Sequence, residues 1–364
     1  MSDHPAIRIE NVCIMFGDKP DQALSLADQG MSRADIQQRT GQVLGVHDCS
    51  LDIAEGEILV LMGLSGSGKS TLLRAINRLN PITRGEVTIW CGGEPRQVRA
   101  AGERSLREIR SSHVSMVFQQ FGLLPWRSVA ANVGLGLELS GLAKAEREAM
   151  VREQLELVGL SAWADRRVEE LSGGMQQRVG LARAFATGAP ILLMDEPFSA
   201  LDPLIRNRLQ DELLDLQGRL RKTIVFVSHD LDEAMKIGSR IAIMEGGRII
   251  QCGTPQEILL QPANDYVSDF VAHMNPVSVL RARDVMRPGV SRSGQSAAGT
   301  VTADTGLRDL IDLAAHRRGT FGVVERGKII GEVDAEAIVS AIARYQRSDS
   351  TSQNGAPAAP HRPR

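Results

Sequence analysis

Apolar and polar residues alternate along residues 7–16 (IRIENVCIMF), as expected for a strand that buries one face. Residues 191–194 and 223–228 are instead apolar runs, which are typical of central strands in a parallel sheet. The predicted strands are 7–16, 46–54, 57–62, 86–91, 114–118, 191–194 and 223–228, and the predicted helices are 70–79 and 128–160. Because strands alternate with helices, the pattern predicts an α/β domain built on a largely parallel sheet.

Three segments depart from this alternation. Residues 17–45 are polar and contain several glycines, and we interpret them as an inserted loop with some helix in its first half. A domain boundary is expected around Pro276, because residues 278–347 have an apolar pattern of their own, with one helix and a hairpin that turns at Arg326-Gly327. Residues 348–364 are polar and rich in proline and alanine, which predicts a disordered tail.

Composition narrows the classes of protein that fit. The 364 residues are enough for about two domains, and 43% apolar with 24% charged residues is ordinary for a globular chain. The 42 basic and 44 acidic residues leave a net charge of −2, which argues against nucleic acid as a partner. The four cysteines have no metal-binding spacing, so reduced thiols in a cytosolic protein are expected. No secretory signal is visible, and no apolar run near the start approaches the ~20 residues of a membrane span.

Residues 63–70 (GLSGSGKS) fit the pattern GxxxxGK[ST] and stand between a predicted strand and a predicted helix. Glycines let backbone N–H groups curl around phosphate oxygens, and the helix N-terminus adds free donors and partial positive charge. Lys69 can reach the β- and γ-phosphates, and the Ser70 hydroxyl can bind Mg²⁺. The motif predicts a nucleotide-binding loop rather than a glycine-rich turn with an incidental lysine.

A second motif, ILLMDE at 191–196, ends a buried strand with two carboxylates. Asp195 lies where it can bind Mg²⁺, directly or through water. Because successive residues of a strand point in opposite directions, Glu196 is directed elsewhere, toward a water in line with the γ-phosphate. The alternative, a strand end followed by a solvated acidic pair, is disfavoured by the phosphate motif upstream.

Between these motifs lies a third, LSGGMQQR at 171–178. Together the three resemble the ATP-binding-cassette (ABC) ATPase family over about residues 7–275. Ser172 with Gly173 and Gly174 forms a second helix start that suits a phosphate. The resemblance implies that this signature contacts ATP held by another subunit. The working unit is therefore expected to be a head-to-tail homodimer with two shared ATP sites, or a heterodimer with a related chain.

The resemblance also implies roles for residues outside the three motifs. Gln119 matches the glutamine that reaches Mg²⁺ and the attacking water, with Gln120 as the neighbouring alternative. His229 matches the histidine that holds the γ-phosphate and Glu196 in register. Phe16 matches the aromatic residue that stacks on adenine, with a core position as its alternative.

The candidate site thus has catalytic, metal-binding and nucleotide-binding residues. The catalytic candidates are Lys69, Gln119, Glu196 and His229. The candidate Mg²⁺ ligands are Ser70, Gln119 and Asp195. The candidate ATP-binding residues are Phe16, Gly63, Ser65, Gly66, Ser67, Gly68, Lys69, Ser70, Thr71, Ser172, Gly173 and Gly174. Ser199–Asp202 matches the loop that runs along the dimer interface and also reads as a helix N-cap.

The implied fold is α/β, with a P-loop NTPase core, an antiparallel β subdomain and a helical subdomain. Residues 282–286 (ARDVM) and the pattern of 300–342 resemble a single CBS unit. Two alternatives stay open for it, a unit that pairs across the dimer and a degenerate structural appendage. The expected parts are a nucleotide-binding domain at 1–275, with the insert at 17–45 and the helical subdomain at 120–175, then a CBS-like segment at 276–347 and the tail at 348–364.

Within the family, the chain resembles most the ATPase subunits of glycine betaine/proline importers, and among these the choline importers. Four stretches carry this resemblance, namely 23–51, 63–80, 199–217 and 228–259. The first is the most specific, because cassettes in general pass from the first strand to the second with only a few residues. The resemblance implies an energy-coupling ATPase, peripheral to the cytoplasmic face of a bacterial inner membrane.

The expected partners are two membrane-spanning permease subunits and a periplasmic or extracellular solute-binding protein. Residues 121–142 are unusually apolar, and Leu123–Trp126 could form part of a groove for the permease's coupling helix. Two other functions stay open. One is an importer ATPase for another small solute, such as an amino acid or polyamine. The other is a soluble cassette in translation or DNA repair, which usually carries two cassettes or a long coiled-coil insertion.

Overall fold

The computed structural model describes residues 4–118, 122–199, 201–272, 274–289 and 298–352, with side chains up to 343. Contacts divide the chain into two units. One comprises Met1–Asp230 with Ile237–Cys252, and the other comprises Leu231–Lys236 with Gly253–Arg364. This division falls earlier than the boundary expected around Pro276, which stays a prediction.

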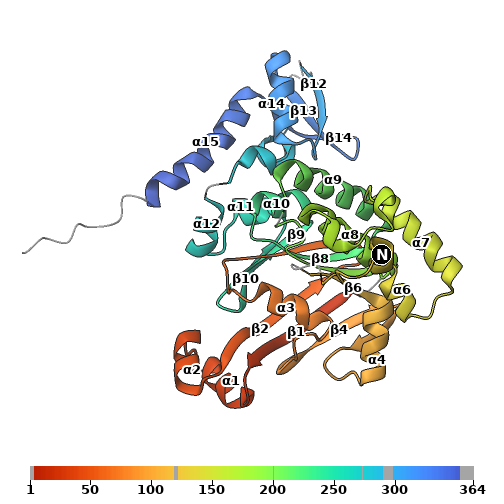
Figure 1. Ribbon diagram of the computed structural model, residues 1–364. Coiled ribbons are helices and arrows are strands. Elements are labelled where there is room, and N and C mark those ends of the chain that lie inside the picture. Colours follow the sequence, from red (N-terminus) through yellow and green to blue (C-terminus); the bar gives the residue numbers. More distant parts are fainter. Residues whose placement is uncertain (1–3, 119–121, 200, 273, 290–297, 353–364) are drawn as a thin grey trace, which may run out of the picture. The chain divides into compact units, whose positions relative to one another are not determined.

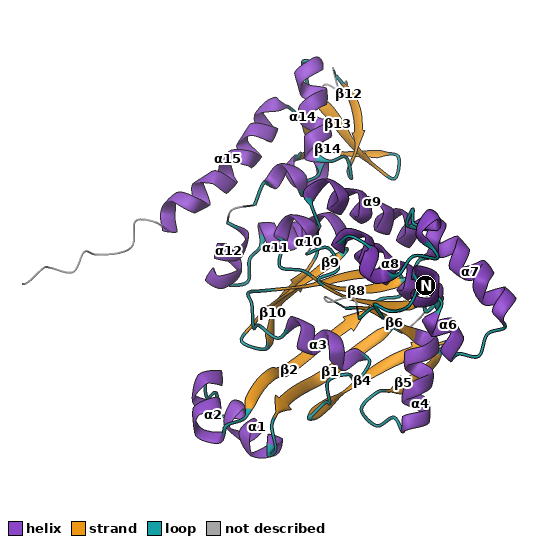
Figure 2. Cartoon of the chain, in the orientation of Figure 1, coloured by secondary structure: helices purple, strands orange, loops and turns teal. Residues whose placement is uncertain are grey.

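A six-stranded sheet forms the centre of the first unit, with the order β10-β9-β3-β8-β7-β6 (Figure 2). Its strands are β3 (Ile58–Met62), β6 (Val114–Val117), β7 (Ile191–Asp195), β8 (Thr223–Val227), β9 (Arg240–Glu245) and β10 (Arg248–Gly253). The pairs β6–β7, β7–β8, β8–β3 and β3–β9 are all parallel. Every residue of β3, β7 and β8 is buried, which explains their uninterrupted apolar sequence. The predicted parallel α/β core is confirmed.

A second, antiparallel sheet in this unit has the order β2-β1-β4-β5. Its strands are β1 (Ile7–Phe16), β2 (Val43–Ile53), β4 (Arg84–Cys91) and β5 (Glu94–Gln97). One apolar cluster joins both sheets with α3 (Lys69–Ile76), α4 (Glu103–Glu108) and the π-helical turn Ile109–His113. The cluster includes Ile14 and Val46 from the antiparallel sheet and Leu61, Leu193 and Val227 from the parallel sheet.

The inserted segment contains two helices, α1 (Pro20–Asp28) and α2 (Arg33–Thr40), where a loop with some helix was expected. They lie together against the ends of β1 and β2 (Figure 1). Ser32 caps the start of α2 with its hydroxyl, and Gly41 ends it in the left-handed conformation. The helices bury a small apolar cluster of their own, made of Cys13, Met15, Ala23, Leu24, Ala27, Ile36 and Leu44.

An ion-pair network fastens the insert to the antiparallel sheet. Both Asp28 carboxylate oxygens accept hydrogen bonds from Arg84, at 2.6 and 2.8 Å, and one lies 2.9 Å from His47 Nε2. The Arg84 and His47 hydrogen bonds hold the pKa of the Asp28 carboxyl well below its usual range. The insert is therefore a docked element, although each half-exposed ion pair contributes at most about 1 kcal/mol.

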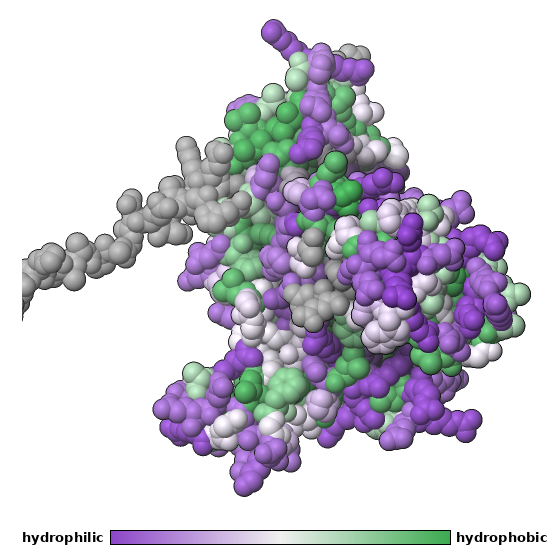
Figure 3. Space-filling view, viewed as in Figure 1, coloured by the Kyte–Doolittle hydropathy of each residue, from purple (hydrophilic) through white to green (hydrophobic). Residues whose placement is uncertain are grey.

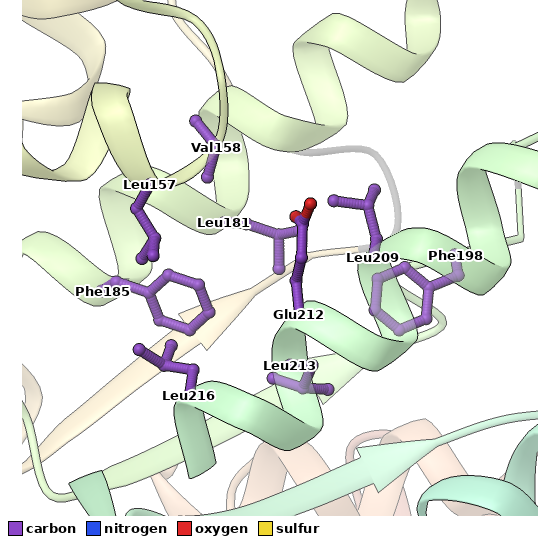
Figure 4. Close-up of a pocket in the computed structure, with 9 residues that line it drawn as sticks. All are labelled: Leu157, Val158, Leu181, Phe185, Phe198, Leu209, Glu212, Leu213 and Leu216. Atoms are coloured by element: carbon purple, nitrogen blue, oxygen red, sulfur yellow. The ribbon is translucent and has the colours of Figure 1, made fainter. Parts of the chain in front are cut away.

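The helices of this unit build a separate apolar cluster. They are α5 (Val129–Val133), α6 (Leu135–Leu139), α7 (Lys144–Leu157), α8 (Gly173–Ala186) and the 3₁₀ turns Ser161–Trp163 and Val168–Glu170. Helix α9 (Pro203–Leu220) lies outside this cluster. Val133, Leu155 and Val179 are buried where α5, α7 and α8 meet. A cavity of about 20 Å³ remains between α7, α8 and α9, and Figure 4 shows its apolar lining around Phe185 and the Glu212 carboxylate. The cavity is too small for a nucleotide.

The second unit contains a smaller sheet with the order β11-β14-β13-β12. Its strands are β11 (Arg287–Pro288), β12 (Gly299–Thr302), β13 (Phe321–Glu325) and β14 (Lys328–Val333). Its helices are α10 (Leu231–Ile237), α11 (Pro255–Leu260), α12 (Asp265–Val271), α13 (Ala282–Val285), α14 (Leu307–His316), α15 (Ala335–Ser352) and the 3₁₀ turn Pro276–Ser278. The hairpin predicted at Arg326-Gly327 is confirmed, with φ of 49° and 77° at the two turn residues. The CBS-like assignment stays a prediction.

Helix α15 reaches Ser352 and so includes the first residues of the segment predicted as a tail. Neither proline nor glycine occurs between Ala335 and Asn354, so nothing in the local sequence ends the helix earlier. The remainder of the predicted tail, 353–364, lies outside the described residues.

Candidate functional site

The phosphate loop, residues 63–68, joins β3 to α3, as the motif predicts. Gly63 has a φ of 142°, and a Cβ there would lie 2.1 Å from the Met244 carbonyl oxygen. Gly68 has a φ of 103°, and its Cβ would lie 2.6 Å from the Gly45 carbonyl oxygen. The loop backbone thus touches the backbones of β9 and β2 directly, and only glycine fits at these two positions.

The turn between β9 and β10 also contacts the phosphate loop, through the backbone of Gly247. Gly247 donates its N–H to the Ser67 carbonyl at 3.0 Å and accepts the His47 N–H at 2.8 Å. A Cβ on Gly247 would lie 2.9 Å from the Gly45 carbonyl oxygen. Sequence reasoning missed both glycines, although Gly45 lies inside a strand, where a glycine signals a close backbone approach. Gly247 lies in a turn and gives no such signal.

The cradle has polar groups that suit a polyphosphate. Lys69 Nζ donates to the carbonyls of Gly63 at 2.7 Å and Leu64 at 3.0 Å. Burial lowers the pKa of the Lys69 ammonium, and the nearby carboxylates of Glu196 and Asp195 partly oppose this. Ser67 Oγ is buried without a hydrogen-bond partner. A buried hydroxyl without a partner is costly, so a phosphate oxygen there would stabilise the site.

Open space lies over the middle of the loop, where a Cβ built on Gly66 would have no neighbour within 4 Å. Together with the buried Ser67 hydroxyl, this space shows that the residues present fit a nucleotide. The loop also includes Ser65, and Thr71 follows in the first turn of α3.

Asp195 ends β7 and is fully buried. Its Oδ1 accepts the Ser70 hydroxyl at 2.6 Å, and its Oδ2 accepts Arg74 Nε at 3.1 Å and Nη2 at 2.7 Å. Two of the three predicted metal ligands, Ser70 and Asp195, are therefore in contact, and a hydroxyl with a carboxylate fits the oxygen preference of Mg²⁺. Sequence reasoning missed Arg74. This arginine lies one turn beyond Ser70 on α3 and reaches Asp195, which is distant in the sequence.

Glu196 and His229 meet at the ends of β7 and β8. Glu196 Oε2 lies 3.3 Å from His229 Nδ1, and the two side chains are 18% and 61% exposed. Glu196 adopts a φ of 48° while its N–H donates to the Val227 carbonyl at 3.1 Å. A positive φ at a residue with a side chain stores strain, typically ~1–3 kcal/mol, and such residues cluster at functional sites. The two neighbouring carboxylates thus have different partners, His229 for Glu196 and Ser70 with Arg74 for Asp195.

Phe16 ends β1 and lies close to the first turn of α3. Its side chain is partly exposed, at 36%. A Cβ on Gly45 would lie 2.8 Å from Phe16 Cε2 and 2.9 Å from Thr71 Cγ2. Gly45 thus leaves room for an aromatic ring next to the first turn of α3, where an adenine could stack.

The signature Ser172–Gly174 belongs to the helical cluster rather than to the core beneath the phosphate loop. Ser172 caps α8 with its hydroxyl, which accepts the Met175 N–H at 3.4 Å. No heavy atom lies within 4 Å of a Cβ built on Gly173. The signature therefore presents an accessible helix start.

The loop expected at the dimer interface is tied to the catalytic turn. Ser199 Oγ donates to the Glu196 carbonyl at 3.0 Å, and Asp202 caps α9 by accepting the Ile205 N–H at 3.1 Å. The remaining candidates, Gln119 and its alternative Gln120, lie outside the described residues.

Asn132 organises the predicted docking stretch. Its fully buried side chain accepts the Leu124 N–H at 2.8 Å and donates to the carbonyls of Leu124 and Ser128, each at 3.0 Å. These bonds fix the loop that carries Trp126, which is 67% exposed. An exposed indole on a fixed loop is a good anchor for a partner.

Comparison with known proteins gives consistent results. The family described as "ABC transporter" matches residues 46–199. The chain is 45% identical, over 93% of its length and 83% of the relative, to the glycine betaine/proline betaine transport system ATP-binding protein of Salmonella typhimurium. It is 50% identical, over 78% of its length and 71% of the relative, to the glycine betaine/carnitine transport ATP-binding protein of Listeria monocytogenes. Among solved structures, a dimeric post-hydrolysis state of the ATP-binding cassette MJ0796 with ADP and Pi matches at TM-score 0.58 and 30% identity, covering 68% of this chain and 98% of that one.

We predict that Gly63→Ala destabilises the chain by more than about 2 kcal/mol, because a Cβ there collides with the Met244 carbonyl at an unfavourable φ. The measurement is urea unfolding of the full chain. Gly92→Ala is the matched control, since Gly92 has a φ of 61° but open space around it, and should cost about 1 kcal/mol. Equal losses in the two variants would contradict the close backbone approach.

Proposed function

Because the chain belongs to the ATP-binding subunits of ABC transporters, we propose that it is the energy-coupling ATPase of an importer for quaternary ammonium solutes. The observation that carries the ATPase assignment is the Glu196–His229 contact of 3.3 Å beside a complete phosphate loop. The type of cargo is supported by relatives whose names specify transport of glycine betaine, proline betaine or carnitine.

The phosphate loop binds the ATP phosphates with backbone N–H groups, the N-terminus of α3 and the Lys69 ammonium. Its hydrogen bonds to the Gly63 and Leu64 carbonyls hold the Lys69 ammonium against the first residues of the loop. Phe16 stacks on adenine. These groups provide fixed positive potential where charge accumulates during phosphoryl transfer, so little reorganisation is needed.

Ser70 and Asp195 are the proposed protein ligands of Mg²⁺, with Gln119 as a third. Mg²⁺ usually takes one or two protein oxygens and completes its shell with phosphates and water, which fits a site with few protein ligands. When bound, the ion neutralises phosphate charge. Arg74 keeps its bonds to the far oxygen of Asp195 and so holds the carboxylate in its ligating orientation.

Glu196 is the proposed general base, which takes the proton of the attacking water. His229 positions the Glu196 carboxylate through their contact and lies exposed toward the γ-phosphate position. Hydrolysis completes only when the signature of a second subunit covers the site. The dimeric state of a cassette that is 30% identical supports this homodimer.

The described residues contain no helix long and apolar enough to span a membrane. The face in Figure 3 mixes hydrophilic and hydrophobic side chains. We place the subunit at the cytoplasmic face of a bacterial inner membrane, where two permease subunits dock against the Trp126 loop and a solute-binding protein delivers the cargo. ATP binding would close the dimer and pull the docked coupling helices together.

A second cargo is favoured by one comparison. The chain is 43% identical, over 91% of its length and 95% of the relative, to the trimethylamine N-oxide transport ATP-binding protein of Ruegeria pomeroyi. Trimethylamine N-oxide shares the trimethylated nitrogen of betaines, so a permease of either specificity suits this subunit.

For the catalytic step, we predict that Glu196→Gln lowers ATP turnover at least about 100-fold and leaves ATP binding unchanged, because the amide cannot accept the water proton. ATPase assays and nucleotide titration of the purified chain measure this. Glu245→Gln, at the exposed end of β9, is the matched control and should keep full activity. Turnover in the Glu196 variant like that of the wild type would remove this residue from the base role.

For the cargo, we predict that cells need this gene, with Glu196 intact, to take up labelled choline or glycine betaine. Competition among choline, glycine betaine, proline and trimethylamine N-oxide ranks the solutes. Uptake of choline that resists excess betaine would mark a choline importer, and equal inhibition would mark a broader osmolyte importer. Gene-dependent uptake of none of these solutes would contradict the proposed cargo and leave the ATPase assignment intact.

For the docking loop, we predict that Trp126→Ala weakens association with the permease about 30-fold, because an exposed anchor residue is lost. Co-purification with the permease and uptake in cells measure this, and ATPase activity of the isolated chain should be unchanged. Trp163→Ala, at a 40% exposed indole of the same helical region, is the control. If both variants associate normally, the docking site lies elsewhere.

A further inference from the structure

The inserted segment reaches the phosphate loop through a single arginine. Arg33, the first residue of α2, donates from Nη1 to the Gly66 carbonyl at 2.6 Å. The same guanidinium donates from Nε to the Leu44 carbonyl at 2.8 Å and from Nη2 to the Gly45 carbonyl at 3.5 Å. One side chain therefore bridges the middle of the phosphate loop to β2.

Arg33 is held in place by helix α2, which is itself capped and packed against the insert. The Ser32 cap sets the start of α2, and Ile36 buries the helix in the insert's own apolar cluster. Asp28 fastens the preceding helix to Arg84 and His47. Because both helices are held, the position of Arg33 on the loop is fixed by the protein itself.

The charge of Arg33 has no counter-ion in the part of the chain that the structure describes. All its hydrogen bonds go to backbone carbonyls, and no carboxylate lies within ion-pair distance. Burial lowers the pKa of this guanidinium, which is the sign of a cation taken partly out of water without a compensating anion. An arginine only needed to fasten the helix would be better served by a carboxylate partner.

We propose that Arg33 is a positioning residue for ATP, which holds the Gly66 part of the phosphate loop against β2 and adds positive charge at the rim of the cradle. A polyphosphate is the anion this uncompensated cation favours. The inference rests on the proposed function and gives the insert a role in it, since the insert's docking then contributes to ATP affinity. The Lys69, Ser70 and Glu196 machinery stays as described.

The experiment compares Arg33→Gln, Arg33→Lys and Arg39→Gln in the full chain. Glutamine keeps an amide donor but loses the charge, and lysine keeps the charge but cannot bridge three carbonyls. Arg39 lies exposed on the same helix and is the matched control. Three quantities are measured: the Kd of a fluorescent ATP analogue at low and high salt, KM and kcat for ATP, and the melting temperature without nucleotide.

We expect Arg33→Gln to raise Kd and KM about tenfold with kcat and melting temperature nearly unchanged, and to weaken the salt dependence of binding. Arg33→Lys should recover much of the affinity, and Arg39→Gln should match the wild type. Binding by Arg33→Gln like that of the wild type would overturn the inference. So would a drop in kcat and melting temperature that lysine does not rescue, since that marks a purely structural role. A wild-type chain that fails to bind or hydrolyse ATP would instead contradict the proposed function.

Discussion

The nucleotide site depends on backbones that touch without side chains between them. Gly45, Gly68 and Gly247 come from β2, the phosphate loop and the β9–β10 turn, and a Cβ on Gly68 or Gly247 would lie within 3 Å of the Gly45 carbonyl oxygen. Through this contact the antiparallel sheet packs against the loop that follows β3 and the turn that follows β9 in the parallel sheet. A Cβ on Gly45 would also collide with Phe16, on the strand paired with β2, and with Thr71 of α3. One close approach of backbones therefore shapes both the phosphate loop and the surroundings of Phe16.

The charged side chains of the site have different kinds of partner. Asp195 has Ser70 and Arg74 as partners and so stays oriented inside the core. Lys69 and Arg33 instead donate to backbone carbonyls, and the Glu196 and Asp195 carboxylates lie near enough to Lys69 to favour its charged form. Glu196 stands at a turn with a positive φ of 48°, and its carboxylate contacts His229 at 3.3 Å.

Much of the core and of the candidate site could be predicted from the sequence. Apolar runs marked β3, β7 and β8, and motif spacing marked the loop and its carboxylates, because these signals are local in the chain. The sequence did not reveal four further residues, Arg33, Arg74, Gly247 and Asn132. The first three act through contacts with segments distant in the sequence, and Asn132 acts by folding the loop just before it. Helix α2 was missed because it buries only Ile36, so its apolar pattern is weak. Its caps, Ser32 and Gly41, were the available signal.

The helical cluster links the proposed membrane contact to the signature. Leu123, beside the Trp126 loop, packs on the same apolar cluster as Leu171, which directly precedes Ser172. Close-packed cores transmit displacement because they hold few voids that could absorb it. A force on the Trp126 loop therefore moves the N-terminus of α8 with it. By contrast, the phosphate loop and Asp195 stand on the sheet core, so coupling between transport and ATP use requires one packed core to shift against the other.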